Sequence, residues 1–127
     1  MALDLRDRKV LWTVSLNGYG FNSILCTKDR LYVAAGGIYA VDPGKGTVLW
    51  RMEDRGQWGF CRGPIVVEGE KAWGLSQEGR MVEIALGNGS MHRSLQLEAG
   101  EFWNPLIRTG GMLIASNAGK EIMAYRW

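Results

Sequence analysis

Few side chains in this sequence can do acid–base, nucleophilic or metal chemistry, and they are scattered. His92 is the single histidine, and the two cysteines are Cys26 and Cys61. One histidine and two separated thiols cannot supply a four-ligand zinc site or a disulfide framework. No nucleophile motif surrounds His92, so a catalytic triad would depend on this one residue. We therefore expect no catalytic residue, no metal ligand and no cofactor site, and we expect His92 to be an exposed residue of a strand.

Both cysteines are predicted to be buried small side chains. Cys26 lies in the apolar run "SILC", and unpaired cysteines are usually buried. Cys61 follows Phe60 and precedes Arg62. A neighbouring arginine can activate a thiol, but packing is the simpler explanation for both residues.

One set of side chains is better suited to binding than to catalysis. Aromatic residues recur in the links that precede each predicted repeat, in "YGFN", "WGFC" and "EFWN", with arginines nearby. Tryptophan, tyrosine and arginine contribute most of the binding energy at protein interfaces. We predict a surface for an unidentified protein partner, formed by Tyr19, Phe21, Asn22, Arg55, Trp58, Phe60, Arg62, Phe102, Trp103, Asn104 and Arg108. The alternative is that these rings only cover the core between repeats.

Charge and hydropathy narrow the classes of partner. The net charge is +2, from 15 Lys and Arg against 13 Asp and Glu, which argues against nucleic acid. No stretch approaches the roughly 18 apolar residues of a membrane span. The mixed charges of "MALDLRDRKVLW" are unlike a signal peptide. We therefore expect neither nucleic acid nor membrane as a partner, and a location that is cytoplasmic or within a particle assembled inside a cell, such as a virion.

A repeat of strands and glycine turns positions all of these residues. Arg30, Lys71 and Met112 begin equivalent segments that are 41 residues apart. Each segment predicts a strand, a turn containing glycine and a second strand. A further strand precedes each pair, and another follows the first two pairs, at residues 47–52 and 90–97. Four strands in a period near 40 residues are typical of propeller blades.

The third unit has no fourth strand after it, whereas residues 9–16 predict an extra strand at the start of the chain. The sequence thus predicts an all-β fold with three four-stranded antiparallel propeller blades in one domain, residues 1–127. The blades are expected at about 17–52, 57–97 and 99–127. Strand 9–16 then supplies the outer strand of a third blade, its own or that of a partner.

A motif of small residues, aspartate and tryptophan accompanies the repeat. Its full form, Ala-x-Asp-x-x-x-Gly-x-x-x-Trp, is present in Ala40, Asp42, Gly46 and Trp50. A second copy has arginine at the glycine position and consists of Ala2, Asp4, Arg8 and Trp12. The second unit keeps only the glycine, with Glu83, Ala85, Gly89 and Arg93 at the four positions. Because alanine and glycine leave a slot for an indole ring, we expect the motif to join adjacent blades.

These motifs resemble the tryptophan-docking motif of the PQQ-like, or quinoprotein-type, β-propellers. The resemblance implies a propeller fold and does not extend to the chemistry of that family's enzymes. Those enzymes bind pyrroloquinoline quinone beside a metal within about eight blades, and they often have a pair of neighbouring cysteines. This chain has no adjacent cysteines. Fold is a weak guide to function, and we do not expect a dehydrogenase.

Three blades do not close a propeller, because known rings have roughly four to eight. An open arc exposes two apolar faces, which a second copy would cover in a six-bladed ring with twofold symmetry. We predict a non-catalytic binding or assembly module that acts as a homodimer, with Lys9–Leu16 pairing with the partner's Glu121–Trp127. Two alternatives are a fragment of a larger propeller and an enzyme with a site on the propeller axis.

Overall fold

The computed structural model of the chain describes residues 1–17, 23–53, 65–76, 78–97, 106–117, 119 and 121–126. Within these ranges the chain forms β-strands and turns, with no helix. The strands pair in four antiparallel sheets of two to four strands. The all-β prediction is therefore confirmed for the described part of the chain.

Two of the sheets have four strands each and follow the chain from one edge to the other. The first blade has the order β3–β4–β5–β6, which are Ser23–Cys26, Leu31–Ala34, Gly37–Val41 and Val48–Glu53. The second blade has the order β7–β8–β9–β10, which are Ile65–Glu68, Lys71–Leu75, Arg80–Ala85 and Met91–Gln96. Short turns join neighbouring strands, as antiparallel pairing allows.

The other two sheets are smaller. The third blade shows three strands in the described residues, β11–β12–β13, which are Ile107–Thr109, Met112–Ser116 and Ile122–Arg126. The N-terminal hairpin consists of β1 and β2, which are Ala2–Asp4 and Lys9–Trp12. Within the predicted strand 9–16, the structure assigns Lys9–Trp12 as β2, and it pairs β2 with the additional strand β1.

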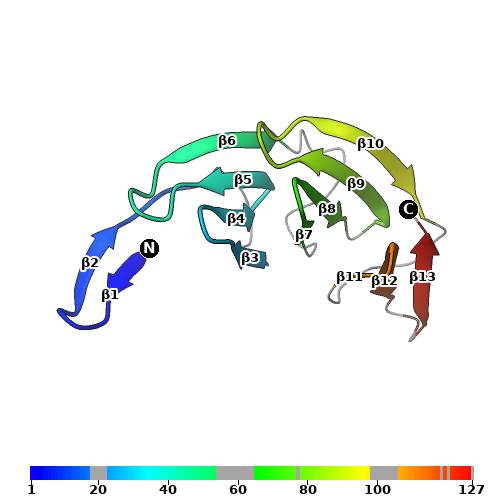
Figure 1. Cartoon of the computed structure of the whole chain (residues 1–127), viewed down its shortest axis with the longest axis horizontal. Coiled ribbons are helices and arrows are strands. Elements are labelled where there is room, and N and C mark those ends of the chain that lie inside the picture. Colours follow the sequence, from blue (N-terminus) through cyan, green and yellow to red (C-terminus); the bar gives the residue numbers. More distant parts are fainter. Residues whose placement is uncertain are drawn as a thin grey trace.

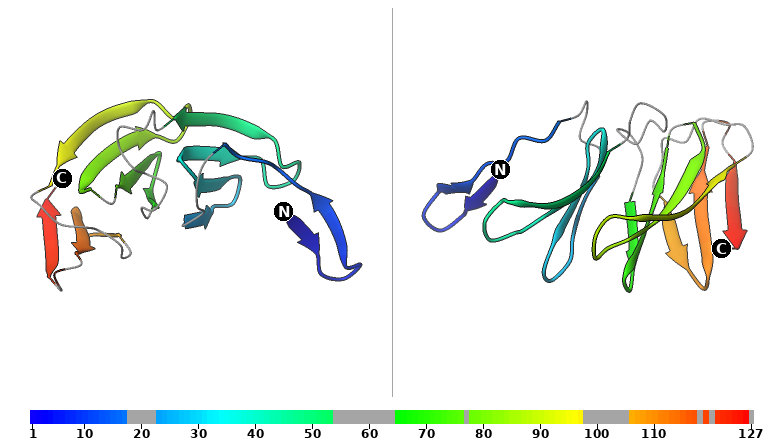
Figure 2. Two further views of the ribbon diagram at one scale, coloured as in Figure 1. Left: turned by 180° about the vertical axis from the view of Figure 1, so that it is seen from behind. Right: turned by 90° about the horizontal axis from the view of Figure 1, so that it is seen from above.

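The four sheets stand side by side along an open arc (Figure 1). Strands β3, β7 and β11 lie on the inner side of the arc, and β6 and β10 run along its outer side. The N-terminal hairpin lies at one end and the third blade at the other, as Figure 2 also shows. Consequently β2 does not reach β13 within the chain, and β13 has no outer neighbour among the described strands.

The same bulge interrupts the outer strand pair of three sheets. Between β5 and β6, Ala40 pairs with Trp50 and Val41 pairs with Val48, so Leu49 has no opposite residue. The other two sheets repeat this pattern, with Glu83–Arg93 followed by Ile84–Met91, and Ala2–Trp12 followed by Leu3–Val10. A bulge redirects side chains at a fixed point of a strand. The shared bulge therefore places Trp12, Trp50 and Arg93 at equivalent positions.

Apolar side chains between neighbouring sheets form the core. The cluster between the first and second blades includes Tyr32, Ile38, Ala72, Val82 and Ile84. The cluster between the second and third blades includes Trp73, Leu75, Met81, Leu113 and Ala115. A smaller cluster joins the first blade to the N-terminal hairpin through Val33, Tyr39, Val41, Trp12 and Val14. Each blade is thus stabilised by its neighbours, as in other repeat architectures.

Candidate functional site

The N-terminal hairpin docks on the first blade through one tryptophan. Trp12 Nε1 donates to the Pro43 carbonyl at 2.9 Å. A Cβ built on Gly46 would lie 2.5 Å from Trp12 Cε3, so the indole packs directly on this glycine. Gly46 also has a φ of 71°, which glycine adopts without strain. Glycine is therefore needed at this position by both the turn and the indole ring.

The first blade docks on the second in the same way. Trp50 Nε1 donates to the Leu86 carbonyl at 2.8 Å, and the Trp50 ring would collide with a Cβ on Gly89. The same carbonyl also accepts from Arg30 Nη1 at 2.6 Å. Two donors of the first blade therefore converge on one turn carbonyl of the second blade.

The aspartate of each motif shapes the turn that the tryptophan contacts. Asp42 Oδ1 accepts from the backbone N–H groups of Gly44 and Lys45 at 2.8 and 2.9 Å. Asp4 Oδ1 accepts in the same way from the backbone of residues 6 and 7. Such side-chain bonds to the backbone stabilise turns. The alanines of the motif lie across the strand pairs from the tryptophans, Ala2 opposite Trp12 and Ala40 opposite Trp50.

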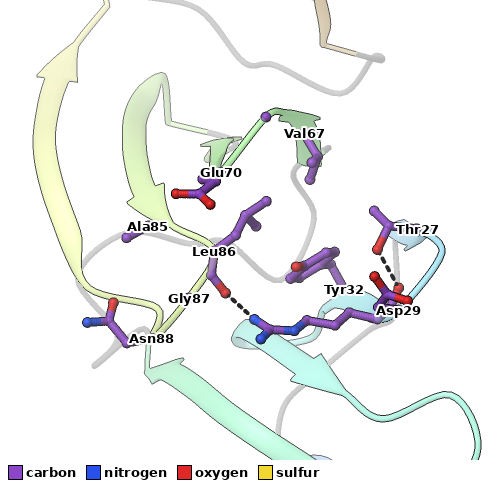
Figure 3. Close-up of a pocket in the computed structure, with 11 residues that line it drawn as sticks. Thr27, Asp29, Tyr32, Val67, Glu70, Ala85, Leu86, Gly87 and Asn88 are labelled. Atoms are coloured by element: carbon purple, nitrogen blue, oxygen red, sulfur yellow. Dashed lines mark hydrogen bonds between the residues drawn. The ribbon is translucent and has the colours of Figure 1, made fainter.

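A groove of about 520 Å³ opens beside the contact between the first and second blades (Figure 3). Arg30 lines this groove and donates from Nη1 to the Leu86 carbonyl. The carboxylates of Asp29 and Glu70 belong to exposed turns at its rim. Because the arginine of the groove already binds a backbone carbonyl of the neighbouring blade, we assign the groove to the contact between blades.

The second blade replaces the alanine and tryptophan of the motif by two charged residues that bind each other. Arg93 Nε donates to Glu83 Oε2 at 3.0 Å, across the strand pair. Lys71 Nζ lies 2.8 Å from Glu83 Oε1. The side chain of Glu83 is 3% exposed, whereas those of Lys71 and Arg93 are about half exposed. A buried carboxylate is thus bound by two cations whose outer parts are open to solvent.

The first blade has an apolar face that no four-stranded sheet of the described residues covers. Ile24 on β3 is 67% exposed, whereas its counterparts Ile65 and Leu106 in the other blades are 7% and 5% exposed. The register of the strand pairs places Ile24 and Ile65 at the same point of their blades. The difference in exposure therefore arises from the neighbouring sheet, because the N-terminal hairpin contains only two strands.

The third blade has the complementary uncovered face at the other end of the arc. Ile122 on β13 is 80% exposed, whereas its counterparts Ile38 and Met81 are 1% and 0% exposed. All three residues pair with the last residue of the preceding strand. Ile107, on the neighbouring β11, is also exposed. An apolar position that is buried in two blades is thus left open in the third.

An apolar groove of about 560 Å³ lies between the N-terminal hairpin and the first blade. Trp12, Val14 and Leu16 line one side of it, and Ile24, Leu31 and Val33 line the other. In the complete blades, the inner two strands occupy the corresponding space. The groove has the position and the apolar lining expected for the two inner strands of another blade.

Most of the predicted partner-binding residues lie outside the described residues. This applies to Tyr19, Phe21, Asn22, Arg55, Trp58, Phe60, Arg62, Phe102, Trp103 and Asn104. Arg108 is described, and its Nε donates to Glu68 Oε2 at 2.8 Å. Its guanidinium carbon also lies 4.7 Å from the ring centroid of Trp73. The structure thus places Arg108 in the contact between the second and third blades.

The prediction for Cys26 was wrong. Cys26 is exposed, because its strand belongs to the uncovered face of the first blade, where Ile24 is exposed as well. Cys61 lies outside the described residues. His92 is an exposed residue of β10, as predicted. In the described ranges, no three His, Cys, Asp or Glu side chains are grouped to hold a metal ion.

Sequence reasoning missed the cluster around Glu83 and the role of Arg30. The signal for the cluster was available, because glutamate and arginine stand at two positions that face each other in the docking motif. An acid and a base across a strand pair favour an ion pair. The bond from Arg30 to Leu86 joins residues 56 positions apart, and no local pattern indicates it.

These features define the class of structure, which is a series of antiparallel propeller blades joined by tryptophan contacts and open at both ends. The described residues contain no helix that could span a membrane. The sequence matches no protein-family model and no curated protein.

Solved structures share the fold. The structure of BamB from Moraxella catarrhalis aligns with a TM-score of 0.76 at 16% identity, over 98% of this chain and 42% of the other. The designed protein Ika4 aligns with a TM-score of 0.69 at 10% identity, over 84% of this chain and 65% of the other. Quinohemoprotein alcohol dehydrogenase from Comamonas testosteroni aligns with a TM-score of 0.67 at 17% identity, over 86% of this chain and 20% of the other. The chain therefore shares the fold of these structures over the aligned residues and spans less than two thirds of each of these proteins.

Proposed function

We propose that this chain is a non-catalytic assembly and binding module whose arc of blades is closed into a ring by a second copy. Each copy contributes three blades, and the ring of six has a size common among propellers. The observation that carries the proposal is the exposure of Ile24 and Ile122, at positions that are buried in the other blades. Closed twofold dimers are the commonest homo-oligomers.

The two ends of the arc leave apolar side chains exposed that a dimer would bury. Burying one aliphatic side chain contributes about 1.5–3 kcal/mol. Ile24 and Ile107 are more than half exposed, and Ile122 is more exposed still. A twofold dimer would bury each of these side chains twice, once in each copy. The gain is therefore of the same order as the cost of association, which is about 4–15 kcal/mol.

The two ends also have complementary shapes. The third blade offers inner strands, and the N-terminal hairpin lacks inner strands beside its apolar groove. In the proposed dimer, the third blade of one copy fills the groove of the other. In that contact Lys9–Leu16 pairs with the partner's β13, and the partner's Ala124–Arg126 take the place that β1 has beside β2. This contact covers an open sheet edge, which otherwise favours aggregation.

A second candidate is that the chain forms one segment of a larger propeller of the PQQ-like family. The observation that favours it is the partial coverage of BamB and of Ika4, 42% and 65%. In that case other blades of the same protein cover Ile24 and Ile122. The two candidates predict different masses for the purified 127-residue chain.

The test measures the mass of the chain in solution by light scattering after size exclusion. The proposal expects a particle with twice the 14.1 kDa mass of the chain. Ile122→Glu should reduce the mass to that of the monomer. Leu49→Glu is the matched control, because Leu49 is a half-exposed leucine of the outer strand β6, away from both ends of the arc. A wild-type chain that remains monomeric and folded at all concentrations contradicts the proposal and favours the segment of a larger propeller.

A further inference from the structure

Strand β1 of the N-terminal hairpin and strand β13 of the third blade occupy the same position in a blade. Beside β2, Ala2 lies opposite Trp12, just as Ala40 of β5 lies opposite Trp50. The strand registers place Ala124 of β13 at the position of Ala40. Both strands thus have a small residue that fits opposite Trp12. In the complete blades an outer strand pairs with one neighbour, so only one of the two strands can pair with β2.

The proposed dimer therefore exchanges one strand pairing for another. Beside β2, β1 contributes three residues, whereas β13 has five. The exchange also pairs the open edge of the third blade, where Ile122 is 80% exposed. One residue pair becomes less favourable, because Lys9 then faces the partner's Arg126 in place of Asp4. Closing the ring thus requires β1 to leave β2, and the longer pairing compensates for its loss.

The turn between β1 and β2 contains backbone strain that is released when β1 leaves. Among the described residues, Arg8 is the one non-glycine residue with a positive φ, which is 54°. Gly46 and Gly89 have the equivalent turn position in the first and second blades, with φ of 71° and 73°. A residue with a Cβ is strained in this left-handed conformation, whereas glycine is not. The hairpin that holds β1 is therefore less stable than its counterparts.

We infer that β1 is an intramolecular competitor, which holds the place of the partner's β13 in the single chain and leaves when two copies close the ring. This inference rests on the proposed dimer and concerns what limits its assembly. The apparent affinity between two chains is lowered by the fraction of chains in which β1 has left β2. This fraction enters twice, because both copies must open. Changes that loosen β1 therefore tighten the dimer, and changes that fix β1 on β2 prevent it.

The experiment fixes β1 on β2 by a disulfide. Leu3 and Val10 lie opposite each other, and both are about half exposed. Directly opposed residues of an antiparallel pair lie close enough for a disulfide, so the variant is Leu3→Cys with Val10→Cys in a Cys26→Ser, Cys61→Ser background. Light scattering after size exclusion should show a monomer for the oxidised variant and a dimer once the bond is reduced.

The matched control is the same bridge in the first blade, Val41→Cys with Val48→Cys in the same background. Val41 and Val48 have the positions of Leu3 and Val10, but their strands stay together when the ring closes. Oxidation of the control variant should leave the mass of the dimer unchanged. Equal effects of the two bridges on the mass overturn the inference.

A second variant loosens β1 and does not depend on a bridge. Asp4 Oδ1 accepts from the backbone N–H groups of residues 6 and 7 at 2.8 and 3.2 Å. In Asp4→Ala the loss of these bonds should make opening roughly threefold more frequent, and because both copies open, Kd should fall about ninefold. Asp42→Ala is the control, because it removes the equivalent bonds from a turn that stays in place, and it should not tighten the dimer.

Sedimentation velocity measures Kd for the wild-type chain and both aspartate variants. A dimer that Asp4→Ala weakens or leaves unchanged overturns the role of β1 while leaving the dimer itself intact. A wild-type chain that is monomeric at all concentrations instead overturns the proposed function.

Discussion

Substituting alanine for Gly89 tests whether the tryptophan contact holds the blades together. Gly89 has a φ of 73°, and a Cβ on it would overlap the Trp50 ring. Gly111 is a matched control, because its φ is 74° and a Cβ on it would meet nothing within 4 Å. Both substitutions have the same backbone cost, so the difference between them measures the contact with Trp50.

The expected loss of unfolding free energy has two contributions, the backbone conformation and the contact with the indole ring. An L-residue in a left-handed conformation costs about 1–2 kcal/mol, and Gly111→Ala should lose only this amount of unfolding free energy. Overpacking costs a further 1–3 kcal/mol or so, which gives Gly89→Ala a loss of about 2–5 kcal/mol. For a domain of this size, each kcal/mol lowers Tm by roughly 4 °C. Gly89→Ala should therefore melt several degrees below Gly111→Ala.

The assay is urea unfolding of both variants, followed by tryptophan fluorescence and circular dichroism. A third variant, Gly89→Ala combined with Trp50→Ala, separates the contact from the backbone cost. In the Trp50→Ala background, Gly89→Ala should lower the unfolding free energy by no more than Gly111→Ala does in the wild-type chain. Equal losses for Gly89→Ala and Gly111→Ala would refute the claim that the indole needs glycine at this turn.

Two further predictions concern the charged cluster and the uncovered face. Glu83→Gln should lower the unfolding free energy by about 1–3 kcal/mol, because Lys71 and Arg93 lose the charge of a buried acceptor. Glu70→Gln, at an exposed carboxylate of a turn, should lower it by less than about 1 kcal/mol. Urea titrations compare the two, and equal losses would contradict the role of Glu83. In a Cys61→Ser background, Cys26 should react rapidly with a thiol reagent in dilute solution. In the concentrated dimer the reaction should be at least several-fold slower. The reason is that Val67, the counterpart of Cys26 in the second blade, is partly covered by the adjacent blade. A rate that does not depend on concentration would show that the face stays open.

The repeat was predictable because residues close together in the sequence indicate each of its strands and turns. Strands that alternate with glycine turns at an interval of 41 residues require no knowledge of distant contacts. Strand β1 was missed because it has three residues, Ala2–Asp4, too few for a pattern. The tryptophan positions were predictable from the motif, whereas their acceptors depend on how one blade meets the next.

Burial was the property that sequence reasoning judged least well. The run "SILC" is as apolar as the strands that are buried, and Ile24 and Cys26 are nevertheless exposed. Their exposure depends on which sheet lies beside them, and the strand's own residues carry no information on that neighbour. The ion pair between Glu83 and Arg93 likewise depends on the register between β9 and β10. The spacing of the motif shows that these two residues face each other only once the two strands are known to pair.

A crystal structure of the assembled 127-residue chain tests the central claim most directly. We expect one closed ring with a twofold axis, in which Ile24 of one copy and Ile122 of the other are buried in the same contact. An isolated arc with both isoleucines in solvent, or a ring closed through other surfaces, would contradict it.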